Sequence, residues 1–202
     1  MWPTLVLVGT STLLATVIGI WVGIRQGWRR GSTFDKTSDV AALTLYSMPE
    51  WWLGLLLVAV FGVGFGPIPG MFPIGGLNSV DADPWSLSGV LDTAWHLALP
   101  VLTLTLAYVA GNSLIMRSSL LEEIGEDYLT TARAKGLRDA EVRDRHAVPN
   151  ALLPTTAQIA LNIGFVVTGA TTVETVFSIP GLGLLATEAL SVPDYWVLQG
   201  AF

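Results

Sequence analysis

Four stretches of this chain are apolar enough, and long enough, to cross a lipid bilayer as helices, which takes about 20 residues each. They run over about Thr4–Ile24, Val40–Phe65, Leu97–Met116 and Ala151–Phe177. A fifth begins near Trp196 and stops at Phe202. We therefore predict an all-α polytopic membrane protein with four complete spans and the start of a fifth.

Glycine and proline interrupt this pattern between the spans. The segment Gly66–His96 is rich in Gly, Pro and Asp, and predicts a loop with a short helix over Pro84–Thr93. The segment Ser178–Asp194 contains Pro180 among glycines, which predicts a broken helix and allows a re-entrant turn. Pro100 is expected near the start of the third span.

The charged residues support a membrane location. Only 13% of the residues are charged, about half of the roughly 25% typical of soluble domains. All ten Lys and Arg residues fall within Arg25–Lys36 and Arg117–Arg145. Cytoplasmic loops of membrane proteins accumulate such residues. Both windows are therefore predicted to be cytoplasmic, with the start of the chain on the outer side.

Several kinds of chemistry are excluded or disfavoured. The chain has no cysteine, so it forms neither disulfides nor thiolate metal sites. Its two histidines, His96 and His146, lie far apart, and the few basic residues share their windows with acids, so we expect no metal centre and no nucleic-acid partner. Neither a GxxxxGK[ST] phosphate loop nor an HExxH or GxSxG motif occurs. We expect no cofactor and no catalytic site, and any nucleotide must be bound by another chain.

The segment Asp127–Pro154 predicts a helix, a break and a second helix on the cytoplasmic side. Gly136 stands where a left-handed C-terminal cap requires glycine. Asp139 is predicted to cap the second helix, with Val142 as its apolar contact. Small residues at Ala132 and Ala134 would let another surface approach closely. Such an elbow suits docking of a cytosolic partner, although many charged amphipathic loops simply lie at the membrane surface.

At this segment the chain resembles a known family. The sequence ARAKGL at Ala132–Leu137 is similar to the inner-loop signature of binding-protein-dependent ABC importer permeases, and Gly136 and Pro149 keep its spacing. The later RHA and NALLP sequences resemble the branch that carries dipeptides, oligopeptides or nickel. Thr130, Thr131, His146 and Val148 depart from the general pattern. Further similarities occur, in the family's order, at Ser47–Gly54, His96–Pro100, Val173–Phe177, Pro180–Gly183 and Asp194–Gly200.

The resemblance implies a type I permease bundle in the cell membrane. Residues 1–202 would form a single transmembrane permease domain, a piece lacking one earlier span, an outer domain and most of the last span. The loop at 117–150 would bind cytosolic ATPases. Expected partners are a second permease subunit, two ABC ATPase subunits, an extracytoplasmic substrate-binding protein and the lipid bilayer. The residues expected to couple the loop to the ATPase are Ala132, Ala134, Gly136, Leu137, Asp139, Ala140 and Val142.

Two acidic residues stand within or beside the predicted spans. Charged groups in a bilayer are costly, so they usually face a bundle interior or water. Glu50 and Glu174 are therefore candidates for the translocation path or its gate, although Glu50 could instead be accommodated at the break made by Pro49. These acids also leave an alternative open, an ion-coupled secondary transporter. The substrate itself, whether peptide, nickel chelate or oligosaccharide, is not predicted.

Overall fold

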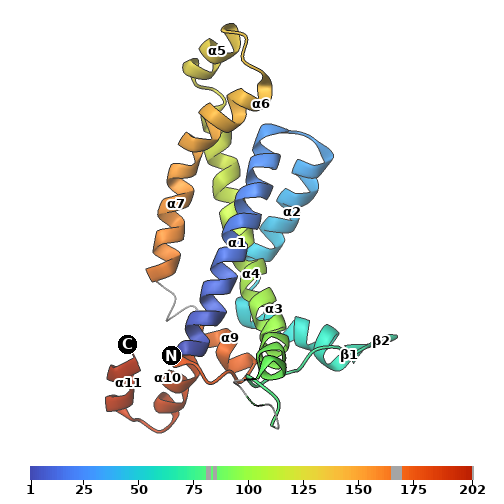
Figure 1. Ribbon diagram of the computed structural model, residues 1–202, viewed down its shortest axis with the longest axis vertical. Coiled ribbons are helices and arrows are strands. Elements are labelled where there is room, and N and C mark those ends of the chain that lie inside the picture. The colour runs from blue at the N-terminus through green and yellow to red at the C-terminus, as the bar shows by residue number, and fades with distance from the viewer. Residues whose placement is uncertain (81–82, 84–85, 165–169, 202) are drawn as a thin grey trace. The chain divides into compact units, whose positions relative to one another are not determined.

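The structure, a computed structural model, describes residues 1–80, 83, 86–164 and 170–201 (Figure 1). Over these ranges the chain is mostly helical and divides into two compact units. Unit 1 comprises Met1–Thr12, Met48–Thr105 and Gly164–Phe202, and unit 2 comprises Leu13–Ser47 and Leu106–Ile163. All ten Lys and Arg residues belong to unit 2, so the charge pattern of the sequence follows the division into units.

Two helices are long and apolar enough to cross a membrane, α1 (Trp2–Trp28) and α4 (Leu87–Glu123). A third candidate is a broken pair, in which α2 (Thr33–Ser47) is separated at Met48 and Pro49 from α3 (Glu50–Leu57) and the π-helical η1 (Val58–Val63). The described residues thus hold two candidate spans, or three if the broken pair is one span. The break at Pro49 was predicted, and it falls within the second apolar stretch.

The fourth and fifth spans stay predictions. The fourth stretch passes through residues 165–169, which lie outside the described residues, as does Phe202 at the end of the fifth. On either side of 165–169 lie α7 (Val148–Gly164) and α9 (Thr171–Val176). The fifth stretch begins in α11 (Tyr195–Ala201).

The start of the third span was predicted wrongly. α4 begins at Leu87, not near Leu97, and Pro100 lies inside the helix. The short helix predicted over Pro84–Thr93 is therefore the beginning of α4, although Pro84 itself lies outside the described residues. Pro100 is tolerated inside α4 because one missing backbone N–H does not outweigh the packing of a long apolar helix.

Two further departures occur in unit 1. The predicted loop after η1 contains a short antiparallel pair, β1 (Gly64–Phe65) and β2 (Ile68–Pro69), with Gly66 in the left-handed region at the turn. The segment Ser178–Asp194 breaks at Pro180 as predicted, but most of it then forms α10 (Leu182–Ser191). Over the described residues, the regular structure is thus helical as expected, except for these two strands of two residues each.

Unit 2 is held together by close packing of α1 on α4. A Cβ atom added at Gly19 would lie 2.6 Å from the Cβ of Asn112, and one added at Gly23 would lie 2.6 Å from the Cβ of Met116. At Gly27 the corresponding distance, to the Cβ of Leu120, is 3.1 Å. Glycines spaced four residues apart form one ridge of a helix, and in membranes such ridges allow backbones to approach closely.

In Figure 1, α2 and α7 run alongside this α1–α4 pair within unit 2, and α5 (Asp127–Ala134) and α6 (Asp139–Val142) lie at one end of it. A further π-helical stretch, η2 (Arg143–Ala147), connects α6 to α7. One buried apolar cluster joins α4, α5, α6, η2 and α7, and its members are Met116, Leu120, Leu129, Ala132, Val142, Ala147 and Ala151.

Candidate coupling site

The helix α5 ends at the glycine that the sequence marked. Gly136 has a φ of +81°, in the left-handed region. Its N–H donates to the carbonyl oxygen of Arg133 at 2.9 Å, and the N–H of Leu137 donates to that of Ala132 at 3.4 Å. These two bonds form a Schellman motif. The prediction of a left-handed cap at Gly136 is confirmed.

The start of α6 differs from the prediction. Asp139 is the first residue of α6 and not its cap. The capping position belongs to Arg138, whose extended backbone precedes the helix and whose N–H donates to the Glu141 carboxylate at 3.4 Å. Asp139 instead uses its side chain elsewhere: its Oδ2 accepts a hydrogen bond of 2.8 Å from the indole N–H of Trp28.

Burial divides the seven predicted coupling residues into two groups. Ala132 and Val142 are buried in the apolar cluster of unit 2. The other five are exposed, and they belong to an unbroken exposed run over residues 133–140, here called the elbow. Leu137 is the only large apolar side chain of the elbow and is 36% exposed. The exposed members of the predicted set are Ala134, Gly136, Leu137, Asp139 and Ala140.

Trp28, at the end of α1, connects the elbow to the first membrane helix. Besides its hydrogen bond to Asp139, its ring lies 5.9 Å from the guanidinium carbon of Arg133, within range of a cation–π interaction. The ring also packs against the apolar cluster. Sequence reasoning missed this residue, although a tryptophan at the end of a span beside a basic window was a signal that could have found it.

A second connection joins the start of α5 to the end of α4 and the start of α7. The phenol of Tyr128 donates to the Glu123 carboxylate and accepts a hydrogen bond of 2.9 Å from the side-chain amide of Asn150. Burial raises the pKa of the Tyr128 phenol above its ordinary value, and the hydrogen bond to Glu123 is the second cause of the increase. The phenol therefore stays neutral at physiological pH and keeps its proton for Glu123.

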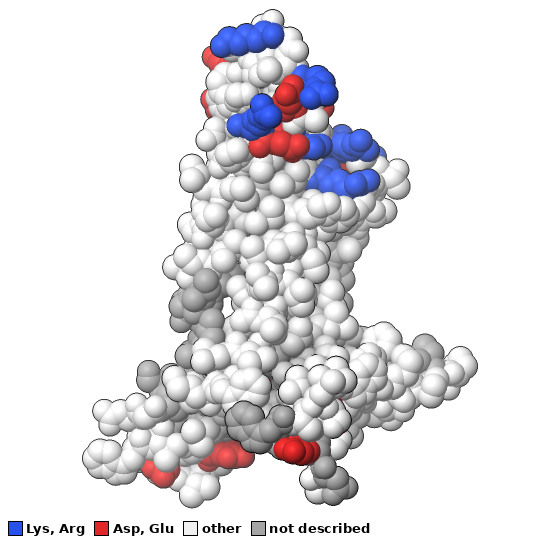
Figure 2. Space-filling view, viewed as in Figure 1, with Lys and Arg blue, Asp and Glu red and all other residues white. Residues whose placement is uncertain are grey.

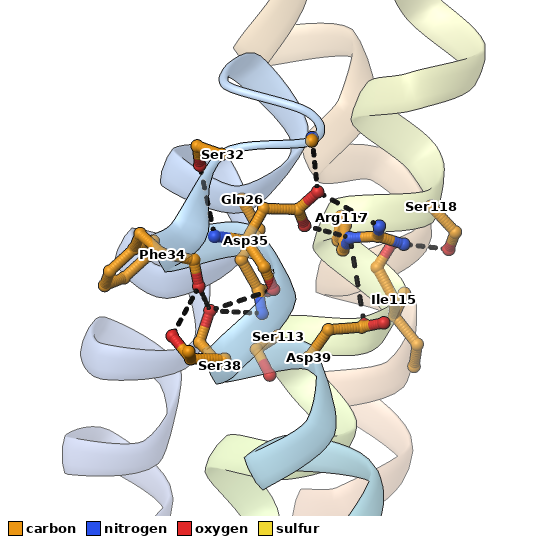
Figure 3. A network of polar contacts seen from close by, with 12 residues as sticks. Gln26, Ser32, Phe34, Asp35, Ser38, Asp39, Ser113, Ile115, Arg117 and Ser118 are labelled. Atoms are coloured by element: carbon orange, nitrogen blue, oxygen red, sulfur yellow. Dashed lines mark hydrogen bonds and ion pairs between the residues drawn. The ribbon is translucent and has the colours of Figure 1, made fainter.

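A buried ion pair joins α2 to α4 below the elbow (Figure 3). The Nε of Arg117 donates to the Oδ1 of Asp35 at 2.7 Å, and Asp35 is only 3% exposed. The other carboxylate oxygen accepts a bond of 2.8 Å from the N–H of Gly31, and Asp39 lies 3.8 Å from the Arg117 Nε. Arg117 was predicted to begin a cytoplasmic loop, but it lies inside α4, where it binds Asp35 of α2.

The same region buries a glutamine. Gln26 of α1 is fully buried, and its amide nitrogen donates to the hydroxyl of Ser38 at 2.9 Å (Figure 3). The hydroxyl of Ser38 in turn donates to the carbonyl oxygen of Phe34. These polar contacts fix the beginning of α2 against both α1 and α4.

The two candidate path residues lie in unit 1. Glu174 is fully buried in α9, and its Oε2 accepts backbone N–H bonds from Gly183 at 2.7 Å and from Leu184 at 3.1 Å. A carboxylate in this position satisfies the free N–H groups at the start of α10. Glu50 is the first residue of α3 and is half-buried. A gating role for either residue stays a prediction, and the contacts found at Glu174 are those of a helix cap.

Comparison with known proteins agrees with the resemblance read from the inner loop. The family model described as "Binding-protein-dependent transport system inner membrane component" matches residues 15–202. The dipeptide transport system permease protein DppB of Escherichia coli K12 is 39% identical over 203 residues, which cover 94% of this chain. The di/tripeptide transport system permease DppB of Pseudomonas aeruginosa is 37% identical over 97% of the chain, and the glutathione transport system permease GsiC of Salmonella choleraesuis is 35% identical over 98%.

The matched regions make up 60%, 61% and 58% of these three relatives, so the chain spans about 60% of their length. The family match, by contrast, covers nearly all of this chain, including the second half of α1, the whole of α4, the elbow and the Glu174 cap. The chain belongs to the family of inner membrane components of binding-protein-dependent transport systems.

Proposed function

We propose that this chain is a permease subunit of an ABC importer and forms part of a translocation path for peptides. Three relatives are named for dipeptides, di- and tripeptides, and glutathione, and all of these are peptides or peptide-like. Nickel or related small solutes are the alternative substrates within the same branch. The chain performs no catalysis itself, and separate cytosolic ATPase subunits hydrolyse ATP.

The proposal rests on the contrast between the exposed elbow and the buried residues that flank it. Eight consecutive residues, 133–140, are exposed, whereas Ala132 and Val142 at its two ends are buried in the cluster of unit 2. Small side chains on the elbow allow a partner surface to approach closely. Because these flanking residues pack in one cluster with α1, α4 and α7, we expect the elbow to move together with those helices. Force applied to the elbow would therefore reach the membrane helices.

Coupling then follows from differential binding. A partner that contacts the elbow differently in two conformations can shift the membrane helices between two arrangements. In this proposal, residues 117–150 form the cytoplasmic coupling loop of a single permease domain over 1–202. The complete importer contains a second permease subunit, two ABC ATPases and an extracytoplasmic binding protein, and it resides in the cell membrane.

The energy source tests this function. Uptake of a labelled dipeptide should fail when cellular ATP is depleted and should persist when a protonophore collapses the ion gradient while ATP is maintained. The opposite pattern would support the ion-coupled alternative and contradict the proposal. The geometry of Glu174 disfavours that alternative, because two backbone N–H groups already hold its carboxylate.

A further inference from the structure

A cavity of about 320 Å³ lies in unit 2 between one face of α1 and the start of η2. One face of α1 lines the cavity with four residues spaced three or four apart, Trp21, Ile24, Arg25 and Trp28. Arg29, which directly follows the end of α1, also lines it. From η2 come Arg143 and Asp144. The cavity is thus lined by three guanidinium groups, one carboxylate and an aromatic and aliphatic wall.

The residues that line this cavity carry an excess of positive charge. Arg143 binds Asp144 through two bonds, of 2.6 and 2.9 Å, so these two charges cancel. Over the described part of the chain, neither Arg25 nor Arg29 forms an ion pair with a carboxylate. The guanidinium of Arg25 lies over the rings of Trp21 and Phe34, at 5.6 and 5.2 Å from their centroids. Two positive charges therefore remain for a ligand.

The shape and chemistry of the cavity suit one class of anion. Guanidinium groups bind phosphate oxygens through paired hydrogen bonds. Trp21, which is 57% exposed, and Ile24 extend the wall toward the apolar part of α1. A free phosphate ion would gain nothing from that wall, whereas a phospholipid could lay its glycerol and first acyl carbons along it.

We propose that this cavity binds the phosphodiester headgroup of an anionic phospholipid of the inner leaflet. The proposal rests on the cytoplasmic orientation of the loops in the proposed function. Figure 2 shows Lys and Arg atoms at the end of unit 2 that carries the elbow, with Asp and Glu atoms between them; an anionic leaflet surface would attract the unpaired basic groups there. Because Trp28 both lines the cavity and binds Asp139, a lipid in the cavity would also restrict movement of the elbow relative to α1.

Lipid retention measured by native mass spectrometry tests the proposal. The complete protein would be released from nanodiscs containing equal amounts of phosphatidylglycerol and phosphatidylcholine. We expect retention of phosphatidylglycerol in preference to phosphatidylcholine, and loss of that preference in the double variant Arg25→Gln/Arg29→Gln. Each arginine should contribute about ten-fold, which corresponds to about 1.5 kcal/mol for a hydrogen bond to a charged group.

Arg30→Gln is the matched control, because Arg30 is exposed and adjacent to Arg29 but does not line the cavity. If the double variant does not accumulate, Arg29→Gln alone should give about half of the effect on a logarithmic scale. Equal retention of the two lipids by the unmodified protein, or an equal loss in Arg30→Gln, would overturn the proposal.

Competition with soluble anions distinguishes the two sources of phosphate. Millimolar inorganic phosphate or glycerol 3-phosphate should leave the bound phosphatidylglycerol in place. Displacement by either would assign the cavity to a soluble phosphate and contradict a lipid site. Because the measurement counts bound lipid and not transport, its failure would leave the proposed importer function untouched.

Discussion

The indole N–H of Trp28 donates to the carboxylate of Asp139 across 2.8 Å, joining residues 111 positions apart in the sequence. Trp28 ends the first membrane helix, and Asp139 begins the second helix of the elbow. This bond is the direct polar connection between α1 and α6 found in unit 2. It provides one route by which movement of the elbow can reach a membrane helix.

Replacing Trp28 with Phe should loosen the elbow without unfolding unit 2, because a phenyl ring can still pack against the apolar cluster while the hydrogen bond to Asp139 is lost. A bond of this kind contributes about 1 kcal/mol. We therefore expect about five-fold faster tryptic cleavage at Arg133, Lys135 and Arg138. Trp21→Phe, on the same face of α1, is the control and should cleave at the normal rate, as should Asp139→Asn, which keeps an acceptor oxygen.

Gly136→Val should insert into the membrane but fail to transport. A Cβ added at Gly136 would meet nothing within 4 Å, so the cost comes from its φ of +81° and not from a clash. A left-handed conformation costs about 1–2 kcal/mol for most residues. Gly136→Asp should also abolish transport, because it adds a negative charge to the exposed elbow. Gly136→Asn should be the best tolerated, since Asn adopts this conformation more readily. Normal peptide uptake by the Val variant would contradict this prediction.

The ion pair of Asp35 and Arg117 should show strong non-additivity. Removing one partner of a buried pair typically costs about 3–5 kcal/mol, whereas replacing both often costs little. Because Arg117 is a quarter exposed, we expect single variants to fall below that range. The midpoint of thermal unfolding, followed by tryptophan fluorescence, should drop more for Asp35→Asn or Arg117→Met than for the double variant. Additive losses would show that the pair does not interact energetically.

The α1–α4 contact should be intolerant of even one methyl group. At Gly23 a Cβ would lie 2.6 Å from the Cβ of Met116 and 2.7 Å from a backbone oxygen, so Gly23→Ala must separate the helices. Overpacking of this kind costs about 1–3 kcal/mol. Gly9→Ala, on the same helix with nothing within 4 Å, is the control and should unfold at the normal temperature or slightly above it, because Ala favours a helix more than Gly does. Equal midpoints for the two variants would rule out close packing at Gly23.

Glu174→Gln distinguishes a helix cap from a proton carrier. The amide oxygen of Gln can still accept the N–H bonds of Gly183 and Leu184, so we expect folding and transport to be largely retained. Glu174→Ala removes the acceptor and should cost about 1 kcal/mol or more. Transport abolished by Gln in a stable, correctly inserted protein would instead indicate that the carboxylate carries protons.

Local features of this chain were predictable from its sequence, and long-range ones were not. The cap at Gly136 depends on the residues of a single turn. The break at Pro49 depends on one missing backbone N–H. Asp139 was misassigned as a cap because its partner, Trp28, is distant in sequence. The charges of Asp35 and Arg117 resemble those of solvated loops until folding brings them together.

Two further misses have different causes. The beginning of α4 was missed because the Gly, Pro and Asp content before Leu97 is typical of a loop. The helix instead begins at Leu87, directly after Ser86, whose hydroxyl accepts a hydrogen bond of 3.0 Å from the N–H of Gly89. The close packing of α1 on α4 could have been predicted, because the spacing of four residues between Gly19, Gly23 and Gly27 places these glycines on one helix ridge.

The most direct test of the coupling proposal uses the absence of native cysteine from this chain. A cysteine at Ala140, which is exposed on the elbow, would be compared with one at Val142, which is fully buried two residues away. Crosslinking to the partner ATPase would be measured in membranes with and without ATP. We predict a crosslink from Ala140→Cys whose yield changes with ATP, and none from Val142→Cys. If Ala140→Cys reacts only with reagents added from outside the cell, or never with an ATPase, the coupling role of the elbow is contradicted.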